Sequence, residues 1–430
     1  MTDTHLSNRR FSDFGLHEKL QQGLNEIGFE FSTPIQALAL PLALEGKDVA
    51  GQAQTGTGKT AAFLLATMNV LLNEAGSPDR KLNQPRAIVI APTRELAIQI
   101  HKDAVTLGKF TDLELGLVYG GVDYEKQRKT IKDGVDILIG TPGRIIDYFK
   151  QHVFDLRAIQ VAVLDEADRM FDLGFIKDIR FLFRRMPDPE KRLSMMFSAT
   201  LSFRVKELAY EHMNNPQAVE VKTENVTADS VKQSLYHVQN EEKIPLLIGL
   251  LNKIDSPRAI IFVNTKRVAE KVTGWLMGND YKVGLISGDV PQKKRERLIR
   301  EIESGEIRLL IATDVAARGL HIPDITHVFN YDLPQNEEDY VHRIGRTARA
   351  GAEGIAISFG CEEFVFSLME IEGYIGHKIP VEAINDELLA SPKPPIKLKK
   401  NPSNRNNTKK ISGNRSRNKS RNNQQRQKKV

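Results

Sequence analysis

Ala53-Gln54-Thr55-Gly56-Thr57-Gly58-Lys59-Thr60 is the most informative motif in the chain for its fold. It follows a short apolar run, Val49–Gly51, and precedes an apolar helical pattern over Ala61–Leu72. Glycines let successive backbone N–H groups crowd around phosphate oxygens, and the N-terminus of a helix favours anions. The stretch therefore predicts a strand, a phosphate-binding loop and a helix. The usual pattern of such loops begins with Gly, and Ala53 stands at that position here.

A second motif supplies carboxylates. The apolar run Val161–Leu164 ends in Asp165-Glu166-Ala167-Asp168. In a nucleotide hydrolase, one carboxylate holds Mg²⁺ through its water shell, and the next can orient and deprotonate the attacking water. Asp165 and Glu166 fit these two roles. Lys59 would then reach the β and γ phosphates, and the Thr60 hydroxyl suits Mg²⁺.

Short apolar, β-branched runs recur along the chain, and most are followed by a turn and a helical pattern. They are Ala87–Ala91, Val135–Ile139, Val161–Leu164, Met195–Phe197, Ala259–Val263, Val283–Ile286, Leu309–Ala312, Thr326–Phe329 and Ile355–Phe359. Continuous apolar runs suit strands covered on both faces, as in parallel sheets. We therefore predict an α/β protein in which the polar motifs lie at the carboxyl ends of the strands, where such folds bind ligands.

The composition of the chain excludes several classes of protein and site. The chain has 430 residues, 40% of them hydrophobic, and no apolar run approaches the ~18 residues that span a bilayer. A single cysteine, Cys361, excludes an intramolecular disulfide and a cysteine zinc cluster. The first residues show no secretory signal, so we expect a cytoplasmic protein without membrane insertion.

Charge is distributed unevenly. Residues 391–430 hold 14 Lys and Arg and no Asp or Glu, which leaves 47 basic against 55 acidic residues in the rest. The same segment has few large apolar residues, so we predict a disordered basic tail. It suits an RNA-binding or partner-binding arm, or a solubilising tail. We predict one domain over 1–221, a linker over 222–229, a second domain over 230–390 and the tail over 391–430.

Arginines recur at a spacing of three in the second half, at Arg343, Arg346 and Arg349. Guanidinium groups suit the charge of a transferring phosphoryl group, although a basic helix face that meets acidic neighbours would look similar. If these arginines complete the site, hydrolysis requires closure of two domains.

Hydroxyls, glycines and arginines follow several of the runs in both halves. Residue types of this kind contact a sugar–phosphate backbone, and they do not resemble a base-reading surface. The candidates for contact with nucleic acid are Pro92, Thr93, Arg94, Gly121, Thr141, Arg144 and Thr313, and the family resemblance given below adds Thr265. Each of these residues, taken alone, could be an ordinary helix cap or turn.

Together these motifs resemble the DEAD-box family of ATP-dependent RNA helicases in superfamily 2, from about Phe11 to about Ile384. The resemblance implies two tandem RecA-like domains with parallel sheets, ATP and Mg²⁺ as cofactors, and RNA bound without sequence preference. It implies that Glu166 is the base, that Thr60 and Asp165 hold Mg²⁺, and that Arg346 and Arg349 are arginine fingers. Ser198 and Thr200 would couple closure to unwinding. The residues that it assigns to ATP are Phe11, Gln36, Ala53, Gln54, Thr55, Gly56, Thr57, Gly58, Lys59, Thr60 and His321.

The resemblance also implies a role and a partner. Gln36–Gln54, Phe175–Pro187 and Leu320–Pro334 are similar to a bacterial family member of the RNA degradosome. That likeness implies a role in mRNA degradation beside the endoribonuclease RNase E. Local, non-processive unwinding of RNA duplexes is the expected activity. An ATP-gated RNA clamp with little unwinding, and a DNA-directed motor of the same superfamily, remain alternatives.

Two positions depart from the family pattern. His321 stands where most members carry an Asp that contacts the ATP ribose, and Ala348 stands where a Gly usually separates the two finger arginines. An imidazole can still donate or accept a hydrogen bond, so we expect somewhat weaker binding of ATP or a dependence on pH near 6–7. A methyl group is small, so we expect the arginine fingers to persist.

Overall fold

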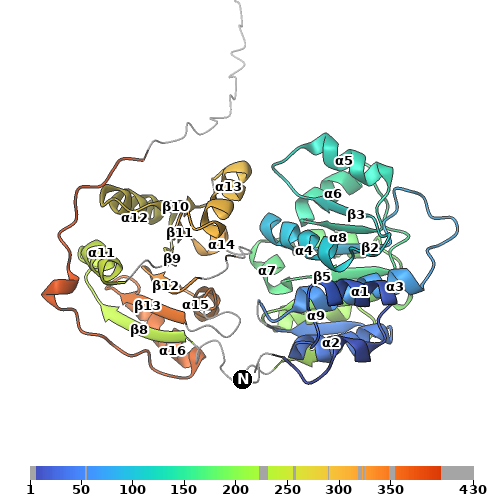
Figure 1. Cartoon of the computed structure of the whole chain (residues 1–430), viewed down its shortest axis with the longest axis horizontal. Helices are drawn as coiled ribbons and strands as arrows, with labels where there is room; N and C mark the ends of the chain where they lie inside the picture. Colours follow the sequence, from blue (N-terminus) through green and yellow to red (C-terminus); the bar gives the residue numbers. More distant parts are fainter. Residues whose placement is uncertain are drawn as a thin grey trace, which may run out of the picture. The chain divides into compact units, whose positions relative to one another are not determined.

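The computed structural model of the chain describes residues 6–53, 56–221, 231–254, 258–288, 290–317, 322, 325–347 and 354–398 (Figure 1). The linker expected over 222–229 and the tail from residue 399 onward lie outside these ranges. Gln54, Thr55, His321, Ala348 and Arg349 also lie outside them.

Across the described residues, the first sheet has seven parallel strands in the order β3-β4-β2-β5-β6-β1-β7. Their bounds are β1 Val49–Gln52, β2 Ala87–Ile90, β3 Leu115–Val118, β4 Ile137–Gly140, β5 Val161–Leu164, β6 Leu193–Ser198 and β7 Gln217–Glu220. The helices around it are η1 Phe11–Phe14, α1 Glu18–Glu26, α2 Pro34–Leu44, α3 Lys59–Asn73, α4 Arg94–Leu107, α5 Tyr124–Asp133, α6 Pro142–Lys150, α7 Ala167–Asp172, α8 Ile176–Phe183, η2 Pro189–Lys191 and α9 Phe203–His212.

Both faces of this sheet are buried, which explains the continuous apolar runs of its central strands. Val89 of β2 packs into a core with α1, α2, α3 and α4. Its neighbours Ile88 and Ile90 point to the opposite face, into a core with the helices α5 to α9. The alternation of side chains along a strand thus divides one run between two cores.

The second sheet has six parallel strands in the described part of the chain, in the order β10-β11-β9-β12-β13-β8. The strands are β8 Val231–His237, β9 Ala259–Phe262, β10 Val283–Ile286, β11 Leu309–Ala312, β12 His327–Asn330 and β13 Gly354–Gly360. The helices are α11 Lys243–Lys253, α12 Lys266–Gly278, α13 Gln292–Glu303, α14 Asp314–Ala317, α15 Glu337–Ile344, η4 Val365–Ser367, α16 Leu368–Ile375 and η5 Asp386–Leu388. The predicted fold class, with two parallel-sheet α/β units, is confirmed.

Hydroxyl residues that follow strands begin the next helices. Thr93 Oγ1 accepts the N–H of Leu96 at 3.3 Å at the start of α4, and Thr265 Oγ1 accepts the N–H of Val268 at 3.2 Å at the start of α12. A capping hydroxyl uses a lone pair in this way and keeps its O–H as a donor. The same threonines can therefore cap a helix and still donate to a phosphate.

The predicted basic tail does not begin where the composition changes. Lys393–Ile396, which we call the C-terminal strap, lies along α12. Its Lys393 N–H donates to Asn279 Oδ1 at 2.8 Å, and its Ile396 N–H donates to the carbonyl of Gly274 at 2.9 Å. Composition missed this segment because its order comes from backbone contacts with α12 rather than from buried side chains.

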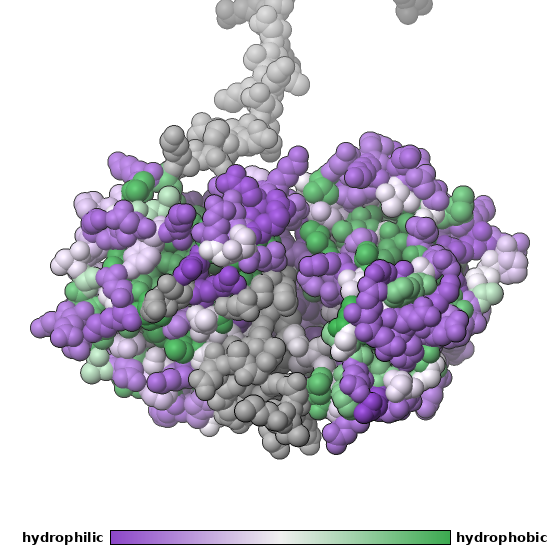
Figure 2. Space-filling model, viewed as in Figure 1, coloured by the Kyte–Doolittle hydropathy of each residue, from purple (hydrophilic) through white to green (hydrophobic). Residues whose placement is uncertain are grey.

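The surface is ordinary for a globular protein. On the face drawn in Figure 2, hydrophilic residues cover most of the coloured surface, and apolar residues form smaller, separate patches. No helix in the described ranges is both long and apolar enough to cross a membrane.

Candidate functional site

The phosphate-binding loop links β1 to α3 through two glycines in left-handed conformations. Gly56 has φ 88° and Gly58 has φ 91°, values that side chains rarely adopt. A Cβ on Gly58 would also lie 2.5 Å from Gln36 Nε2 and 2.9 Å from Thr33 Oγ1. Gly58 is therefore fixed both by its backbone conformation and by the close approach of the segment that precedes α2.

Lys59 is the first residue of α3 and is 6% exposed. Its Nζ donates a hydrogen bond to the carbonyl of Ala53 at 2.7 Å. This bond holds the ammonium across the loop that begins at Ala53. An ammonium has three N–H donors, so Lys59 can bridge the loop and still donate to phosphate oxygens.

Gln36 connects the segment before α2 to the loop. Its Oε1 accepts the N–H of Thr33 at 2.8 Å, and its Nε2 donates to the carbonyl of Gly58 at 3.0 Å. An amide has two N–H donors and two acceptor lone pairs, so one of each remains for the edge of a base. Gln36, which the family resemblance assigns to ATP, thus also positions the phosphate loop.

Phe11 lies behind the wall of the cavity. It is 2% exposed, and its ring stacks on Phe29 with the centroids 6.4 Å apart and an angle of 16° between the planes. Phe29 and Phe31 line the cavity, and Phe29 is 45% exposed. Phe11, which the family resemblance assigns to ATP, therefore does not itself line the cavity; it supports the ring of Phe29, which does.

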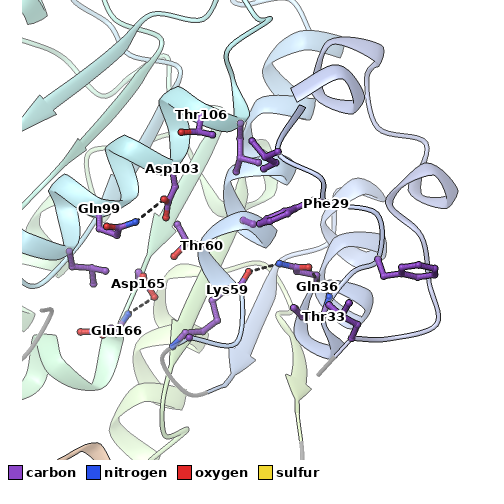
Figure 3. A pocket seen from close by; sticks show the side chains of 18 of the residues that line it. Phe29, Thr33, Gln36, Lys59, Thr60, Gln99, Asp103, Thr106, Asp165 and Glu166 are labelled. Atoms are coloured by element: carbon purple, nitrogen blue, oxygen red, sulfur yellow. Dashed lines mark hydrogen bonds between the residues drawn. The ribbon is translucent and has the colours of Figure 1, made fainter. Parts of the chain in front are cut away.

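The cavity has a volume of about 560 Å³ and brings most of these residues together (Figure 3). Phe29, Thr33 and Gln36 lie on one side in Figure 3, with Lys59 and Thr60 between them and the carboxylates Asp165 and Glu166. The residues that line it are Leu6, Ile27, Phe29, Phe31, Thr33, Gln36, Gly56, Gly58, Lys59, Thr60, Ala61, Leu96, Gln99, Asp103, Thr106, Leu107, Asp165, Glu166 and Arg346.

The two carboxylates differ in their electrostatics. Burial raises the pKa of Asp165 to about 6, against the attraction of Lys59. Burial also opposes ionisation of Glu166, but Arg169, Lys59 and Arg346 outweigh it and hold the pKa of Glu166 below its usual range. Glu166 is therefore a carboxylate at neutral pH and can accept a proton.

Glu166 is also held in an uncommon backbone conformation. Its φ of 50° and ψ of 54° are left-handed, which costs a non-glycine residue about 1–2 kcal/mol. Oε2 of Glu166 is buried and accepts no hydrogen bond from the described residues, although Arg169 Nε lies 3.6 Å away. Strain and an unsatisfied buried acceptor at one residue are typical of a catalytic position.

The donor set fits Mg²⁺. Asp165 and the Thr60 hydroxyl both line the cavity, and both offer oxygen, which this ion prefers. Among the described residues, no three His, Cys, Asp or Glu side chains form a group that could hold a metal. Mg²⁺ keeps several waters and takes one or two carboxylates together with phosphate oxygens, so a dedicated cage is not required.

Arg346, Ser198 and Thr200 are three further residues to which the sequence assigned a role. Arg346 is 6% exposed and lies on the wall of the cavity, although the helix that precedes it, α15, packs on the second sheet. Ser198, at the end of β6, is fully buried, and its Oγ accepts the N–H of Asp168 at 3.2 Å. Ser198 therefore contacts the acidic motif directly, and Thr200 follows it at a half-buried position.

The predicted RNA contacts group at strand ends. Pro92, Thr93 and Arg94 follow β2, Gly121 follows β3, and Thr141 and Arg144 follow β4. These three strands are neighbours, so their carboxyl ends share one edge of the sheet. Thr265 and Thr313 follow the adjacent strands β9 and β11 of the second sheet. The structure thus gathers the candidates into two groups, one at the end of each sheet.

Neighbouring groups position the arginines among these candidates. A Cβ on Gly121 would lie 2.7 Å from Arg94 Nη1, so this glycine lets the guanidinium pass close to the backbone. Arg94 Nη1 also donates to Gln292 Oε1 at 3.2 Å. The Arg144 guanidinium lies 4.8 Å from the Tyr124 ring centroid and donates to the Tyr148 hydroxyl at 3.1 Å.

Sequence reasoning missed the role of Arg343. The spacing of Arg343, Arg346 and Arg349 suggests either contacts with a phosphoryl group or a basic helix face that meets acidic neighbours. Arg343 is 1% exposed, so it is not part of an exposed face. Its guanidinium binds Asp314 through two hydrogen bonds and donates to Asn264 Oδ1 at 2.8 Å. The available signal was its spacing of three residues from Tyr340, which places Arg343 on the buried face of α15 together with Ile344.

Comparisons with known proteins agree with this geometry. Residues 33–208 match the DEAD/DEAH box helicase family, and residues 242–351 match the helicase conserved C-terminal domain. The chain is 60% identical to an ATP-dependent RNA helicase RhlB of Shewanella piezotolerans, over 94% of this chain and 92% of that protein. It is also 60% identical to the RhlB of Shewanella halifaxensis, over 94% and 93%.

Solved structures give the same result. Saccharomyces cerevisiae Dbp5 bound to RNA and ADP BeF3 superposes with a TM-score of 0.75 at 33% identity, covering 87% of this chain and 95% of that one. Mss116p bound to ssRNA and AMP-PNP superposes with a TM-score of 0.76 at 27% identity, covering 89% and 81%.

Proposed function

Because this chain belongs to the DEAD-box family of ATP-dependent RNA helicases, it is an RNA-dependent ATPase, and we propose that it separates short RNA duplexes locally. In this proposal each cycle of ATP binding and hydrolysis opens a few base pairs. The protein then releases the strand without travelling along it.

The single observation that carries the proposal is that Arg346 shares a cavity with Lys59 and Glu166. Arg346 follows α15 of the second sheet, whereas the phosphate loop and the acidic motif follow strands of the first. A site assembled from both sheets is complete only when the two are held together. ATP and an RNA strand that contacts both sheets would therefore favour the same closed state.

We assign the chemical roles within this site as follows. Glu166 orients the attacking water and accepts its proton, since nearby cations keep it ionised. Lys59, Arg346 and Arg349 stabilise the charge that develops on the transferring phosphoryl group. Asp165 and Thr60 would hold Mg²⁺, which would supply positive charge beside the phosphates.

We further assign base recognition to Gln36 and Phe29. The remaining donor and acceptor of the Gln36 amide match the donor and acceptor pattern of an adenine edge, and Phe29 offers a ring face. RNA would contact the two strand-end groups through hydroxyls, arginines and backbone N–H groups, which suit a sugar–phosphate backbone. This choice of groups supports binding without sequence preference.

The relatives named RhlB support a finer proposal. We propose that the chain acts in mRNA degradation in the cytoplasm, as part of an RNA degradosome, with the endoribonuclease RNase E as its partner. Affinity capture with a purified RNase E scaffold fragment tests the partner, because it measures direct binding between two known proteins.

Steady-state ATPase activity tests the proposed function, measured without nucleic acid, with single-stranded RNA and with single-stranded DNA. We expect RNA alone to stimulate hydrolysis, and Glu166→Gln to abolish that stimulation while ATP still binds. Release of a labelled strand from a short RNA duplex then tests strand separation. ATP-dependent retention of RNA without strand release would instead indicate an RNA clamp, and equal stimulation by DNA would contradict RNA specificity.

A further inference from the structure

The carboxyl edge of the second sheet carries a row of polar groups from five neighbouring strands. Asp314 follows β11, Asn264 follows β9, Asp332 follows β12 and Cys361 follows β13. Lys243 begins α11, the helix that follows β8. The strands lie in the order β11-β9-β12-β13-β8 (Figure 1), so these five residues form one row along the edge, which we call the sheet-edge row.

Lys243 ends this row as a buried cation. Lys243 and Asp332 are each 2% exposed, and Nζ of the lysine lies 2.5 Å from Oδ1 of the carboxylate. The ammonium also lies 4.3 Å from the ring centroid of Tyr331 and 3.7 Å from the Sγ of Cys361. A buried ion pair is tolerated only where such contacts replace the lost water. The lysine is therefore committed to Asp332.

Asp332 uses its side chain and its main chain to hold two different segments. Its Oδ2 accepts the backbone N–H of Asn264 at 3.0 Å, and Asn264 immediately precedes Thr265, the N-cap of α12. Its backbone carbonyl accepts a hydrogen bond from Arg343 Nη1 at 2.5 Å. Arg343 lies on α15, the helix that leads to Arg346. One residue thus fixes both a candidate RNA contact and the approach to a candidate arginine finger.

Arg343 connects the row to its other end. Its Nη2 donates to Asn264 Oδ1 at 2.8 Å, and its fork binds the Asp314 carboxylate. The charges along the edge are balanced in two pairs, Lys243 with Asp332 and Arg343 with Asp314. Because these pairs are largely buried, removal of one charge leaves its partner without compensation.

Loss of the Lys243 charge would therefore disturb the row beyond its own position. Arg343 is the cation that already contacts residue 332. If the Asp332 side chain turned toward that guanidinium, it would give up the N–H of Asn264. If the guanidinium moved instead, the fork to Asp314 would loosen. Both displacements reach the side of the sheet edge that faces the candidate RNA contacts.

We propose that Lys243 is a positioning residue for RNA-stimulated hydrolysis. It touches neither ATP nor RNA, and it acts by balancing the charge of Asp332. Asp332 in turn keeps Thr265 and Arg346 in place. This inference rests on the proposed function, in which Thr265 and Thr313 contact RNA. The groups assigned to ATP lie mostly beside the first sheet, so loss of Lys243 should weaken the response to RNA rather than the binding of ATP.

The test separates the charge from the side chain. Lys243→Met removes the charge and keeps an unbranched side chain that can fill the same space. Lys243→Met combined with Asp332→Asn removes both charges, and the amide oxygen can still accept the same backbone N–H. Lys253→Met is the matched control, because Lys253 also lies on α11 but is 48% exposed in its 3.4 Å pair with Glu387.

We expect Lys243→Met to raise the RNA concentration that half-saturates ATPase stimulation by about threefold to tenfold. kcat at saturating RNA should also fall, and binding of a fluorescent ATP analogue without RNA should not change. The double variant should return the half-saturating concentration toward the parental value, and Lys253→Met should match the parent. Loss of stability alone lowers the amount of active protein and leaves the half-saturating concentration unchanged.

A folding check accompanies these measurements. Trp275, the one tryptophan in the sequence, packs against the core of the second sheet, so its fluorescence reports whether this part of each variant is folded. If Lys243→Met does not fold, Lys243→Gln repeats the test, because its amide can still donate to Asp332 without carrying a charge. We expect a smaller rise in the half-saturating RNA concentration for that variant.

Two outcomes would overturn the inference. A parental half-saturating RNA concentration in folded Lys243→Met would show that the sheet-edge row does not position the RNA contacts. An equal rise in the single and double variants would show that charge balance with Asp332 plays no part. Both outcomes leave RNA stimulation of the parent chain intact, whereas failure of the proposed function would remove that stimulation from the parent itself.

Discussion

Arg343 and Asp314 form a bidentate ion pair in which Nε lies 2.6 Å from Oδ1 and Nη2 lies 2.7 Å from Oδ2. The pair joins α15, which precedes Arg346, to the segment after β11 that carries Thr313. A fork of two parallel hydrogen bonds fixes orientation as well as distance. Arg343 thus couples the placement of a candidate arginine finger to that of a candidate RNA contact.

Arg343→Ala should lower the free energy of unfolding by about 3 kcal/mol, because it leaves the largely buried Asp314 carboxylate and the Asn264 side chain without their partner. Urea unfolding followed by circular dichroism measures this change. Arg297→Ala is the control, since the side chain of Arg297 is 70% exposed in its pair with Glu301. The free energy of unfolding of that variant should differ from the parent's by less than about 1 kcal/mol. Equal effects of the two substitutions would show that the buried ion pair contributes no more than the exposed one.

Glu166→Gln should lower kcat for RNA-stimulated hydrolysis by about 10²–10⁴-fold, because an amide cannot accept the proton of the attacking water. Binding of ATP should persist, since Glu166 contributes no positive charge to hold phosphate. Single-turnover hydrolysis and equilibrium binding of a fluorescent ATP analogue measure the two effects separately. A parallel loss of binding and rate would argue for a structural role of Glu166.

Gly58→Ala should raise the KM for ATP more than Gly56→Ala does. Both glycines have positive φ, so both alanines are strained by about 1 kcal/mol. Only the methyl group at position 58 also clashes, because Gln36 Nε2 would lie 2.5 Å away, whereas nothing lies within 4 Å at position 56. Initial-rate measurements over a range of ATP concentrations compare the two variants, and a larger effect at position 56 would contradict the argument.

Asp165→Asn should stabilise the protein at neutral pH when Mg²⁺ and nucleotide are removed with EDTA and dialysis. The pKa of Asp165 is raised from 3.8 to about 6, so the folded state binds this proton more tightly than the unfolded state does. Its contribution to stability is present below pH 3.8 and is lost as the pH rises through 6. A difference of about two pH units corresponds to about 3 kcal/mol.

The advantage of Asp165→Asn over the parent should therefore grow between pH 4 and pH 7 and then level off. Urea unfolding at a series of pH values measures this trend. A constant difference across the range would show that Asp165 is not a buried carboxylate with a raised pKa.

Several strands could be predicted from the sequence almost to the residue. The central strands Val161–Leu164 and Leu309–Ala312 were predicted with the bounds that the structure gives, and so was the edge strand Val283–Ile286. The strands that were not predicted are β3, Leu115–Val118, β7, Gln217–Glu220, and β8, Val231–His237, and all three lie at edges of their sheets. Buried residues alternate with more exposed ones in these strands, and Gly116 or polar residues interrupt their apolar runs.

The site could be predicted where the functional residues are contiguous in the sequence, as in the phosphate loop and the acidic motif. It could not be predicted where a role depends on packing. Phe11 and Phe29 are both aromatic, and only their burial shows which ring faces the cavity. Gly274 and Gly278 carry no chemistry of their own, so their purpose is visible only in the strap that lies against them.

The left-handed backbone of Glu166 has a consequence for how such enzymes evolve. Asparagine and glycine adopt this conformation more readily than glutamate does, and either residue would also remove the buried acceptor at Oε2. A single change at position 166 would therefore relieve strain while abolishing hydrolysis. At this position, a change that converts the ATPase into a protein that binds RNA without releasing it would stabilise the fold. Selection for turnover would be needed to keep Glu166.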